Sequence, residues 1–403
     1  MMDLVTHFRV ADVDPQELSD LLLRYFKRAQ SPKPRVVVYG EDGKPGLTVK
    51  FDRKGKAIAM EPVGELTETE IDEIAANVTK ELATPGPSII GRGVFVSNIP
   101  TRGTFRYRDQ FAILPVPDDA PRPQQFLGLH PFEIQVRFTA STNTQVTTFR
   151  RPNALREFEL LCAALLAANI RSVGNNAAIG HWVLENPGEI RPKVVYRQEM
   201  YLFDGFFPVS ADFTATDGIE RMPFVDPQIY YTRHGYSVAD QLDLPVTFQI
   251  ALERYFKLDE ARRQQFRRAA YWYEFAKETW QRSRSAAFLA FVSAIEALKN
   301  AHAEEPEKCA TCGQRIGRTA TARFVDLLDR LAPIAGIPGE NRRTYFSLRS
   351  ALAHGDKLLQ EDLSYWGPSQ MQEQQELRAL GQIVQVVLYN WIMTAPPAGF
   401  WEQ

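Results

Sequence analysis

The sequence is poor in cysteine and close to electrical neutrality, and both features exclude classes of protein. Only 3 of the 403 residues are cysteine, which excludes the disulfide framework of a small secreted protein and predicts a reducing compartment. The formal net charge of −2 excludes a globally basic coat for nucleic acid. Any contact with RNA therefore has to be made by a local basic surface.

The sequence also lacks a long hydrophobic run. A membrane-spanning helix needs about 20 mostly apolar residues, and no stretch of the sequence approaches this. The first residues, MMDLVTHFRVADVD, carry acids where a signal peptide carries basic and then apolar residues. We therefore expect a cytoplasmic protein that makes no contact with a membrane.

The composition and length are those of a folded protein with two domains. Hydrophobic residues make up 44% of the chain and charged residues 24%, which is ample material for packed cores. The pattern of apolar residues changes near Pro245, where strand signals stop and helical periodicity begins. We predict an α+β domain over residues 1–245 and an all-helical domain over residues 246–403.

The first domain should contain largely antiparallel sheet, because its apolar runs are short and several alternate with polar residues. The predicted strands begin at Arg35, Gly46, Lys56, Gly93, Phe105, Phe132, Thr144 and Lys193, and the run from Phe105 to Val116 is predicted as one strand. The predicted helices cover residues 15–30, 66–83 and 153–169, the second capped by Thr67 or Thr69.

The second domain should be a helical bundle, because apolar residues recur there at intervals of three and four. The predicted helices cover residues 245–257, 260–282, 284–302, 320–333, 341–354 and 371–394.

One segment of the helical domain carries a motif with chemical meaning. In YFSLRSALAHGDKL, Arg349 stands five positions before His354 in an Arg-x4-His pattern. Gly355 follows where a left-handed helix cap is expected. An earlier helix contains SAIEAL, with Glu296 as its acid. The alternative interpretation is that Arg349 and His354 have no catalytic role and only cap and solvate the end of a helix.

This order of a long basic helix, an Ala-rich helix with an acid, and Arg-x4-His before a last apolar helix resembles an Apea-like HEPN domain. The resemblance is confined to residues 246–403. It implies a homodimer formed about the motif helix and a metal-independent endoribonuclease that needs no cofactor for catalysis. It also implies a role as a toxin or abortive-infection effector in prokaryotic antiviral defence.

The resemblance assigns roles to four residues. His354 would take the proton of a ribose 2′-hydroxyl or protonate the leaving 5′-oxygen, because an imidazole can do either near neutral pH. Arg349 would hold the scissile phosphate, with Glu296 in support. The product would carry a 2′,3′-cyclic phosphate. Ser350 departs from the family pattern, which often has Asn, Asp or His after the arginine, and a serine is no acid or base at ordinary pH.

Two other functions remain open. Ser350 and the absence of a second catalytic acid favour a catalytically inactive HEPN scaffold that binds RNA or protein partners. The first domain would sense a trigger or recruit something if the second is a nuclease. The weaker alternative is a separate enzymatic site in the first domain, and no group of residues there supports it.

Residues 261–285 are a candidate RNA-binding segment, because arginines alternate there with Tyr271, Trp272, Tyr273 and Trp280. Aromatic rings between basic side chains can stack bases. The alternative is a helix with an aromatic core stripe and a solvated arginine face. The predicted phosphate contacts are Arg282 and Arg284, together with Lys357 beyond the motif helix.

A structural zinc site is the remaining candidate. Cys309 and Cys312, in EKCATCGQRI, have the spacing of half a zinc knuckle, and His302 could be a third ligand. The same cysteine pair from a second subunit could complete the site, and a pair of free thiols is the alternative. Cys162 lies in an apolar helical run and is predicted to pack in a core.

Overall fold

The computed structural model describes most of the chain. The described residues are 3–11, 13–41, 43–53, 55–84, 86–116, 130–141, 144–172, 181–184, 193–196, 209–232, 241–299, 307–308, 315–316, 320–332, 339–363 and 370–394. The chain divides into two compact units, the first formed by Met1–Arg92, Gln135–Leu155 and Phe203–Thr214, the second by Gly93–Ile134, Arg156–Leu202 and Ala215–Gln403. The predicted domain boundary at residue 245 lies within the second unit and stays a prediction.

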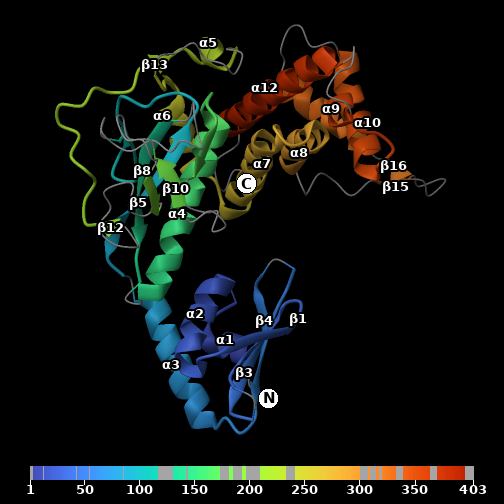
Figure 1. The fold of residues 1–403 in the computed structure, drawn as a ribbon. Helices are drawn as coiled ribbons and strands as arrows, with labels where there is room; N and C mark the ends of the chain where they lie inside the picture. Colours follow the sequence, from blue (N-terminus) through green and yellow to red (C-terminus); the bar gives the residue numbers. More distant parts are fainter. Residues whose placement is uncertain are drawn as a thin grey trace. The chain divides into compact units, whose positions relative to one another are not determined.

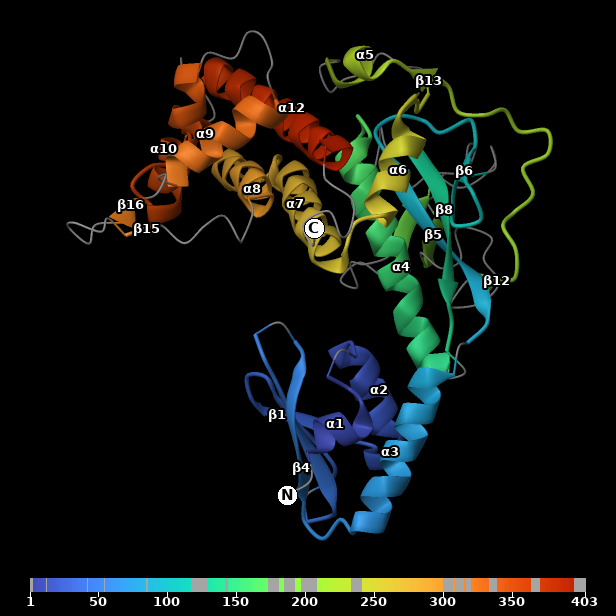
Figure 2. The ribbon, with the colours of Figure 1, turned by 180° about the vertical axis from the view of Figure 1, so that it is seen from behind.

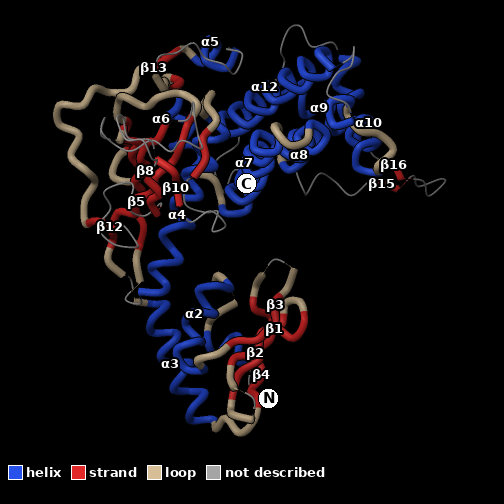
Figure 3. The backbone as a smooth tube through the Cα atoms, in the orientation of Figure 1, coloured by secondary structure: helices blue, strands red, loops and turns tan. Residues whose placement is uncertain are grey.

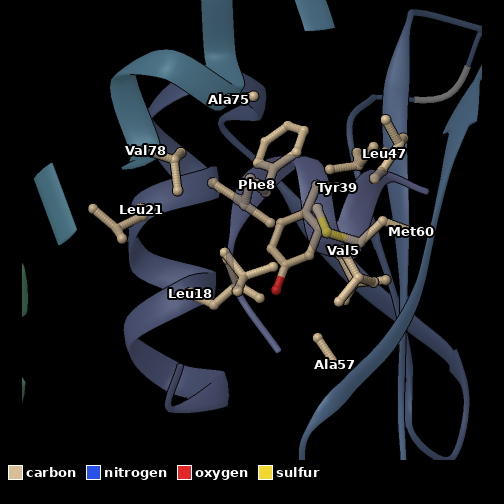
Figure 4. Packing of buried hydrophobic residues seen from close by; sticks show 14 of the residues in the cluster. Val5, Phe8, Leu18, Leu21, Tyr39, Leu47, Ala57, Met60, Ala75 and Val78 are labelled. Atoms are coloured by element: carbon tan, nitrogen blue, oxygen red, sulfur yellow. The ribbon is translucent and has the colours of Figure 1, made fainter. Parts of the chain in front are cut away.

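The first unit begins with a module of three helices and a four-stranded antiparallel sheet. Its elements are α1 (Leu4–Phe8), α2 (Pro15–Phe26), β1 (Ala29–Lys33), β2 (Val36–Tyr39), β3 (Gly46–Phe51), β4 (Ala57–Val63) and α3 (Glu68–Ala83). The strands lie in the order β1-β2-β3-β4, and α1 and α2 lie between α3 and the sheet (Figures 1 and 2). Figure 4 shows the core between these layers, where Phe8, Leu18 and Tyr39 are fully buried.

Local signals explain most of this module. Of the two predicted caps of α3, Thr67 and Thr69, the structure has Thr67, which forms a capping box with Glu70. The helix α2 ends at Phe26, earlier than predicted, because Lys27 takes a left-handed conformation with φ of 57°. The strand β1 was not predicted, since Ala29–Lys33 has no β-branched residue and contains a proline, which an exposed edge strand tolerates.

A second sheet of six strands has the order β12-β5-β8-β7-β6, with β9 paired to β5. Its strands are β5 (Ser88–Ser97), β6 (Phe105–Tyr107), β7 (Phe111–Pro115), β8 (His130–Thr139), β9 (Ile170–Ser172) and β12 (Val209–Ser210). The prediction of one strand from Phe105 is wrong, because β6 and β7 form an antiparallel hairpin. Arg108, with φ of 50°, lies in the turn between the two strands.

The predicted strand at Thr144 is also wrong. Thr144 begins α4 (Thr144–Leu165), which has Pro152 in its interior and ends four residues before the predicted helix 153–169 does. The β-branched residues of TQVTTFR favour a strand only weakly. The hydroxyl of Thr147 bonds both to the backbone N–H of Ser141, at 2.9 Å, and to its carbonyl, at 2.9 Å. This link ties the first turns of the helix to the preceding strand end.

The predicted helical region is confirmed, because every predicted helix after residue 245 has a counterpart (Figure 3). The helices are α6 (Phe248–Phe256), α7 (Glu260–Thr279), α8 (Arg284–Ala297), α9 (Ala320–Leu331), α10 (Gly339–His354) and α12 (Gln370–Thr394), with the short α5 (Pro227–Thr232) and α11 (Gln360–Leu363) in addition. Short paired strands complete the described elements: β10 (His181–Leu184) with β11 (Lys193–Tyr196), β13 (Phe224–Val225) with β14 (Leu244–Pro245), and β15 (Glu307–Lys308) with β16 (Arg315–Ile316). None of the helices in the described part of the chain is long and apolar enough to cross a membrane.

Within the second unit, polar side chains from three helices fix the C-terminal end of α4. The Tyr231 hydroxyl of α5 donates to the carbonyl of Leu165 at 2.8 Å, and Gln385 of α12 donates to the carbonyl of Leu166 at 2.7 Å. Lys277 of α7 donates to the carbonyls of Ala163 and Ala168. The last carbonyls of a helix have no partner within it, so these bonds join α4 to the helical region at little desolvation cost.

Lys277 makes this junction sensitive to pH. Burial of its ammonium group, which lies 4.7 Å from the centre of the Tyr273 ring, lowers the pKa of Lys277 to about 8. In the unfolded chain this pKa returns to about 10.4, so the unfolded state binds more protons between these values. The free energy of unfolding should therefore rise as the pH increases from about 8 towards 10, by up to about 1.4 kcal/mol per pH unit.

This pH dependence can be measured by urea denaturation of the wild type and a Lys277→Met variant between pH 7.5 and 9.5. Burial raises the pKa values of Cys162 and of the buried tyrosines, and these groups are present in both proteins. The difference between the two free energies of unfolding therefore reports the titration of Lys277 alone. A difference that stays constant with pH would show that Lys277 does not titrate in this window.

Candidate functional site

The candidate site is built on α10, the helix that carries the Arg-x4-His motif. Ser350 and His354 are one turn apart and lie on the same side of this helix. Arg349 is separated from His354 by roughly 140° around an ideal helix axis. Arg349 and Ser350 are partly exposed and His354 is exposed. A single copy of α10 therefore directs the two motif residues to different sides.

Arg349 contacts the acid that the sequence singled out. Its Nη2 atom lies 3.1 Å from Oε2 of Glu296 on α8, and the other oxygen of Glu296 lies 3.0 Å from Nζ of Lys299. Arg349 and Glu296 are 35% and 22% exposed, so the pair lies at the surface. The structure thus brings together two of the predicted site residues from helices that are far apart in the sequence.

Lys299 belongs to this site, although the sequence interpretation did not include it. Its ammonium group lies 5.1 Å from the ring centre of Phe346 and 5.5 Å from that of Phe324, at distances typical of cation–π contacts. It therefore holds one carboxylate oxygen of Glu296 while Arg349 contacts the other, and it packs on α9 and α10. The spacing of three residues from Glu296 was the available signal.

The end of α10 is closed by the glycine cap that the sequence predicted. Gly355 has φ of 78°, its N–H donates to the carbonyl of Leu352, and the N–H of Asp356 donates to the carbonyl of Ala351. This is the pair of bonds of a Schellman motif. It makes His354 the last residue before the chain turns, so its imidazole lies at the exposed end of the helix.

The segment after α10 is anchored on the N-terminus of α8. The carboxylate of Asp362 accepts hydrogen bonds from the backbone N–H groups of Arg284 and Ser285 and from the hydroxyl of Ser283. Burial opposes ionisation of Asp362, but these bonds hold its pKa below the ordinary value. The hydroxyl of Ser285 also accepts from the N–H of Leu359. Both ends of α8 therefore contact the motif segment or its continuation.

Arg284, predicted to contact RNA, is committed to other partners. Its guanidinium forms a bidentate pair with Glu361 at 2.8 and 2.9 Å, donates to the carbonyl of Trp280, and lies over the Trp280 ring. The hydrogen bond from Arg284 lowers the pKa of Glu361. Only 16% of the Arg284 side chain is exposed. These contacts favour a structural role, and contact of Arg284 with RNA stays a prediction.

Arg282 and Lys357 are in a different position, because both are exposed. Within the described ranges, neither has an ion-pair partner. Their exposure leaves them accessible, and their contact with phosphate stays a prediction.

The zinc prediction lies outside the described residues, since Cys309, Cys312 and His302 are not among them. Among the residues that the structure does describe, no group of three or more His, Cys, Asp or Glu side chains is arranged to hold a metal ion. Cys162 is fully buried in α4, which confirms its predicted role in core packing.

The chain was compared with protein-family models, with curated proteins and with solved structures, and none of them matches it.

Proposed function

We propose that the helical region is a metal-independent endoribonuclease of the HEPN type. The observation that carries the proposal is the state of Arg349. Its side chain is 35% exposed and is held at one nitrogen by Glu296, on the helix that ends at an exposed His354. A guanidinium has five N–H donors, and the described residues give Arg349 one ion-pair partner. Most of its donors therefore remain available for a phosphate, in contrast to those of Arg284.

The chemistry follows from these two side chains. His354 would remove the proton of a ribose 2′-hydroxyl, whose oxygen forms a bond to phosphorus while the bond from phosphorus to the 5′-oxygen breaks. The departing oxygen takes up a proton, so the products are a 2′,3′-cyclic phosphate and a 5′-hydroxyl. Arg349 would stabilise the additional negative charge on the phosphoryl oxygens during the transfer.

The divergence of Arg349 and His354 around α10 leads us to include a second copy of the chain in the proposal. Two copies that pack about α10 would supply Arg349 from one subunit and His354 from the other to one cleft. Leu358, Leu363 and Met371, which follow the motif, are exposed by 47%, 68% and 72%, and such exposed apolar residues support an interface there. The role in antiviral defence and the regulatory role of the first domain rest on the resemblance alone.

The same divergence favours one alternative, a catalytically inactive scaffold. In a monomer, a separation of roughly 140° around α10 directs the two side chains away from a common phosphate, unless the end of the helix at Gly355 brings them to one site. Ser350, which lies on the side of His354, supplies no additional acid or base. The scaffold binds RNA or a protein partner without cleaving RNA.

The deciding experiment is incubation of the purified chain with total RNA and with tRNA in EDTA, followed by mapping of the product ends. We expect fragments with 2′,3′-cyclic phosphate and 5′-hydroxyl ends. Intact RNA over a range of protein concentrations that includes the dimer would reject the ribonuclease and leave the scaffold.

Glu296 should act as a positioning residue, and its replacement separates that role from a structural one. An exposed ion pair contributes only about 0–1 kcal/mol to stability, so Glu296→Gln should unfold at nearly the wild-type temperature. Because the guanidinium loses its anchor, we expect RNA cleavage to slow by about 10-fold, mainly in kcat, at a cost of about 1.4 kcal/mol. Unchanged cleavage in Glu296→Gln would show that the ion pair only joins α8 to α10. Glu253→Gln, which removes the exposed pair with Arg108, is the matched control.

A further inference from the structure

The helix α7 carries aromatic side chains on its exposed surface, where a globular helix normally has polar residues. Tyr271 is 45% exposed and Trp272 is 38% exposed, whereas Tyr273 is buried. The predicted aromatic core stripe of this segment is therefore only partly correct. The exposed rings need a separate explanation, since they contribute little to the core.

The exposed rings form one cluster. The Tyr271 ring is stacked with Phe275 at a centroid distance of 6.2 Å and an angle of 16°, and Trp272 meets both rings edge to face, at 5.6 Å from Tyr271 and 5.8 Å from Phe275. Rings that support one another in this way hold defined orientations. A flat ligand can stack on such a surface without first having to order flexible side chains.

The rings border a hollow with a basic lining. Gln264, Arg267, Arg268, Tyr271 and Trp272 line an open, shallow hollow of about 330 Å³ on the surface of α7. None of the lining residues is acidic. Arg267 is paired with Glu260 at 2.8 Å, whereas Arg268 is exposed and, within the described ranges, has no ion-pair partner.

A series of contacts connects this helix to the candidate site in the same unit. Gln265, next to Gln264, donates to the carbonyl of Lys299 at 2.9 Å. Lys299 in turn pairs with Glu296, which holds Arg349. The hollow therefore lies on α7, and α7 is bonded through Gln265 to the end of α8 where Glu296 holds Arg349.

We infer that this face of α7 is a stacking platform for single-stranded RNA, in which a base packs on Tyr271 or Trp272 and Arg268 contacts the neighbouring phosphate. Ring faces accept any base and guanidinium groups neutralise phosphates. The amide nitrogen of Gln264 donates to Glu260 at 3.1 Å, and its amide oxygen can accept a hydrogen bond from a base edge. A duplex keeps its bases stacked internally and offers none to the rings. The inference deepens the proposed function, on which it rests for the identity of the ligand as RNA.

The test is fluorescence anisotropy of a short labelled oligouridine with the full chain carrying His354→Ala, so that cleavage does not interfere. We expect Tyr271→Ser combined with Trp272→Ser to weaken binding by at least about 10-fold. Tyr271→Phe combined with Trp272→Phe should retain binding, because it keeps the rings. Arg268→Gln should weaken binding and reduce the slope of log K against log salt by about 1.

Controls separate the possible outcomes. Tyr25→Ser removes an exposed tyrosine of α2 and should leave the affinity unchanged, and circular dichroism should confirm that each variant is folded. Equal affinity of the serine variant and its parent, or tighter binding of duplex than of oligouridine, would overturn the inference. A change in the mass of the serine variant in solution, with the affinity for RNA retained, would overturn it in favour of a protein interface. Binding that depends on the rings in a chain that never cleaves RNA would uphold the platform and reject only the ribonuclease.

Discussion

Replacement of His354 by alanine is expected to slow RNA cleavage by about 10²–10⁴-fold, the usual contribution of a general acid or base. The imidazole is exposed at the end of α10 and contributes little to packing. The thermal stability of the variant should therefore stay within about 0.5 kcal/mol of that of the wild type. The measurement is the initial rate of cleavage of a labelled RNA under single-turnover conditions, in EDTA.

A matched control is available on the same helix. Ser347 is also exposed, and Ser347→Ala should cleave RNA at the wild-type rate. Mixing the His354→Ala chain with an Arg349→Ala chain tests the proposed arrangement of two copies, because heterodimers would contain one site with both native residues. Recovery of part of the activity in the mixture supports a shared cleft. Equal cleavage by His354→Ala and wild type would leave the scaffold as the function.

Replacement of Arg156 by leucine is expected to lower the free energy of unfolding by about 3–5 kcal/mol, the usual cost of removing one partner of a buried ion pair. Arg156 lies between Glu159, at 2.7 Å, and Glu274 of α7, with which it forms two hydrogen bonds. The two carboxylates are only 3% and 4% exposed. Burial by itself would lower the pKa of Arg156, but the bonds and charges of the two glutamates raise it above its ordinary value.

The effect of Arg156→Leu should appear as a lower urea midpoint in equilibrium denaturation. The loss is large because two buried carboxylates lose the guanidinium that forms ion pairs with both of them. Arg106→Leu is the matched control, since Arg106 forms a pair of the same i,i+3 spacing with Asp109 at the surface and should cost no more than about 1 kcal/mol. Adding Glu274→Leu to Arg156→Leu should recover part of the loss. A loss equal to that of the surface control would mean that water reaches the two carboxylates.

Some features of the candidate site could be predicted from residue patterns, and others could not. The glycine cap at Gly355 could be predicted, because a left-handed residue at a helix end depends only on its neighbours in the chain. The resemblance gave Glu296 a supporting role, and its contact with Arg349 came from the packing of α10 on α8. Arg284 and Arg349 were both predicted to contact an RNA phosphate. They differ because α11 brings Glu361 to Arg284, whereas Arg349 is left 35% exposed.

The sequence alone was sufficient to predict the helical region after residue 245, the strands β2, β3 and β4, and a threonine cap at Thr67 or Thr69, since periodicity and capping act over one or two turns. Packing was needed to establish that Thr144 begins a helix, that Phe105–Pro115 contains a hairpin, and that Tyr271 and Trp272 face outward while Tyr273 is buried. The hairpin and the start of α4 depend on specific contacts, the turn at Arg108 and the bonds of Thr147 to Ser141, which apolar patterns do not report. The orientation of the α7 rings depends on packing against segments that are distant along the chain, and such contacts outweigh local preferences of a few tenths of a kcal/mol per residue.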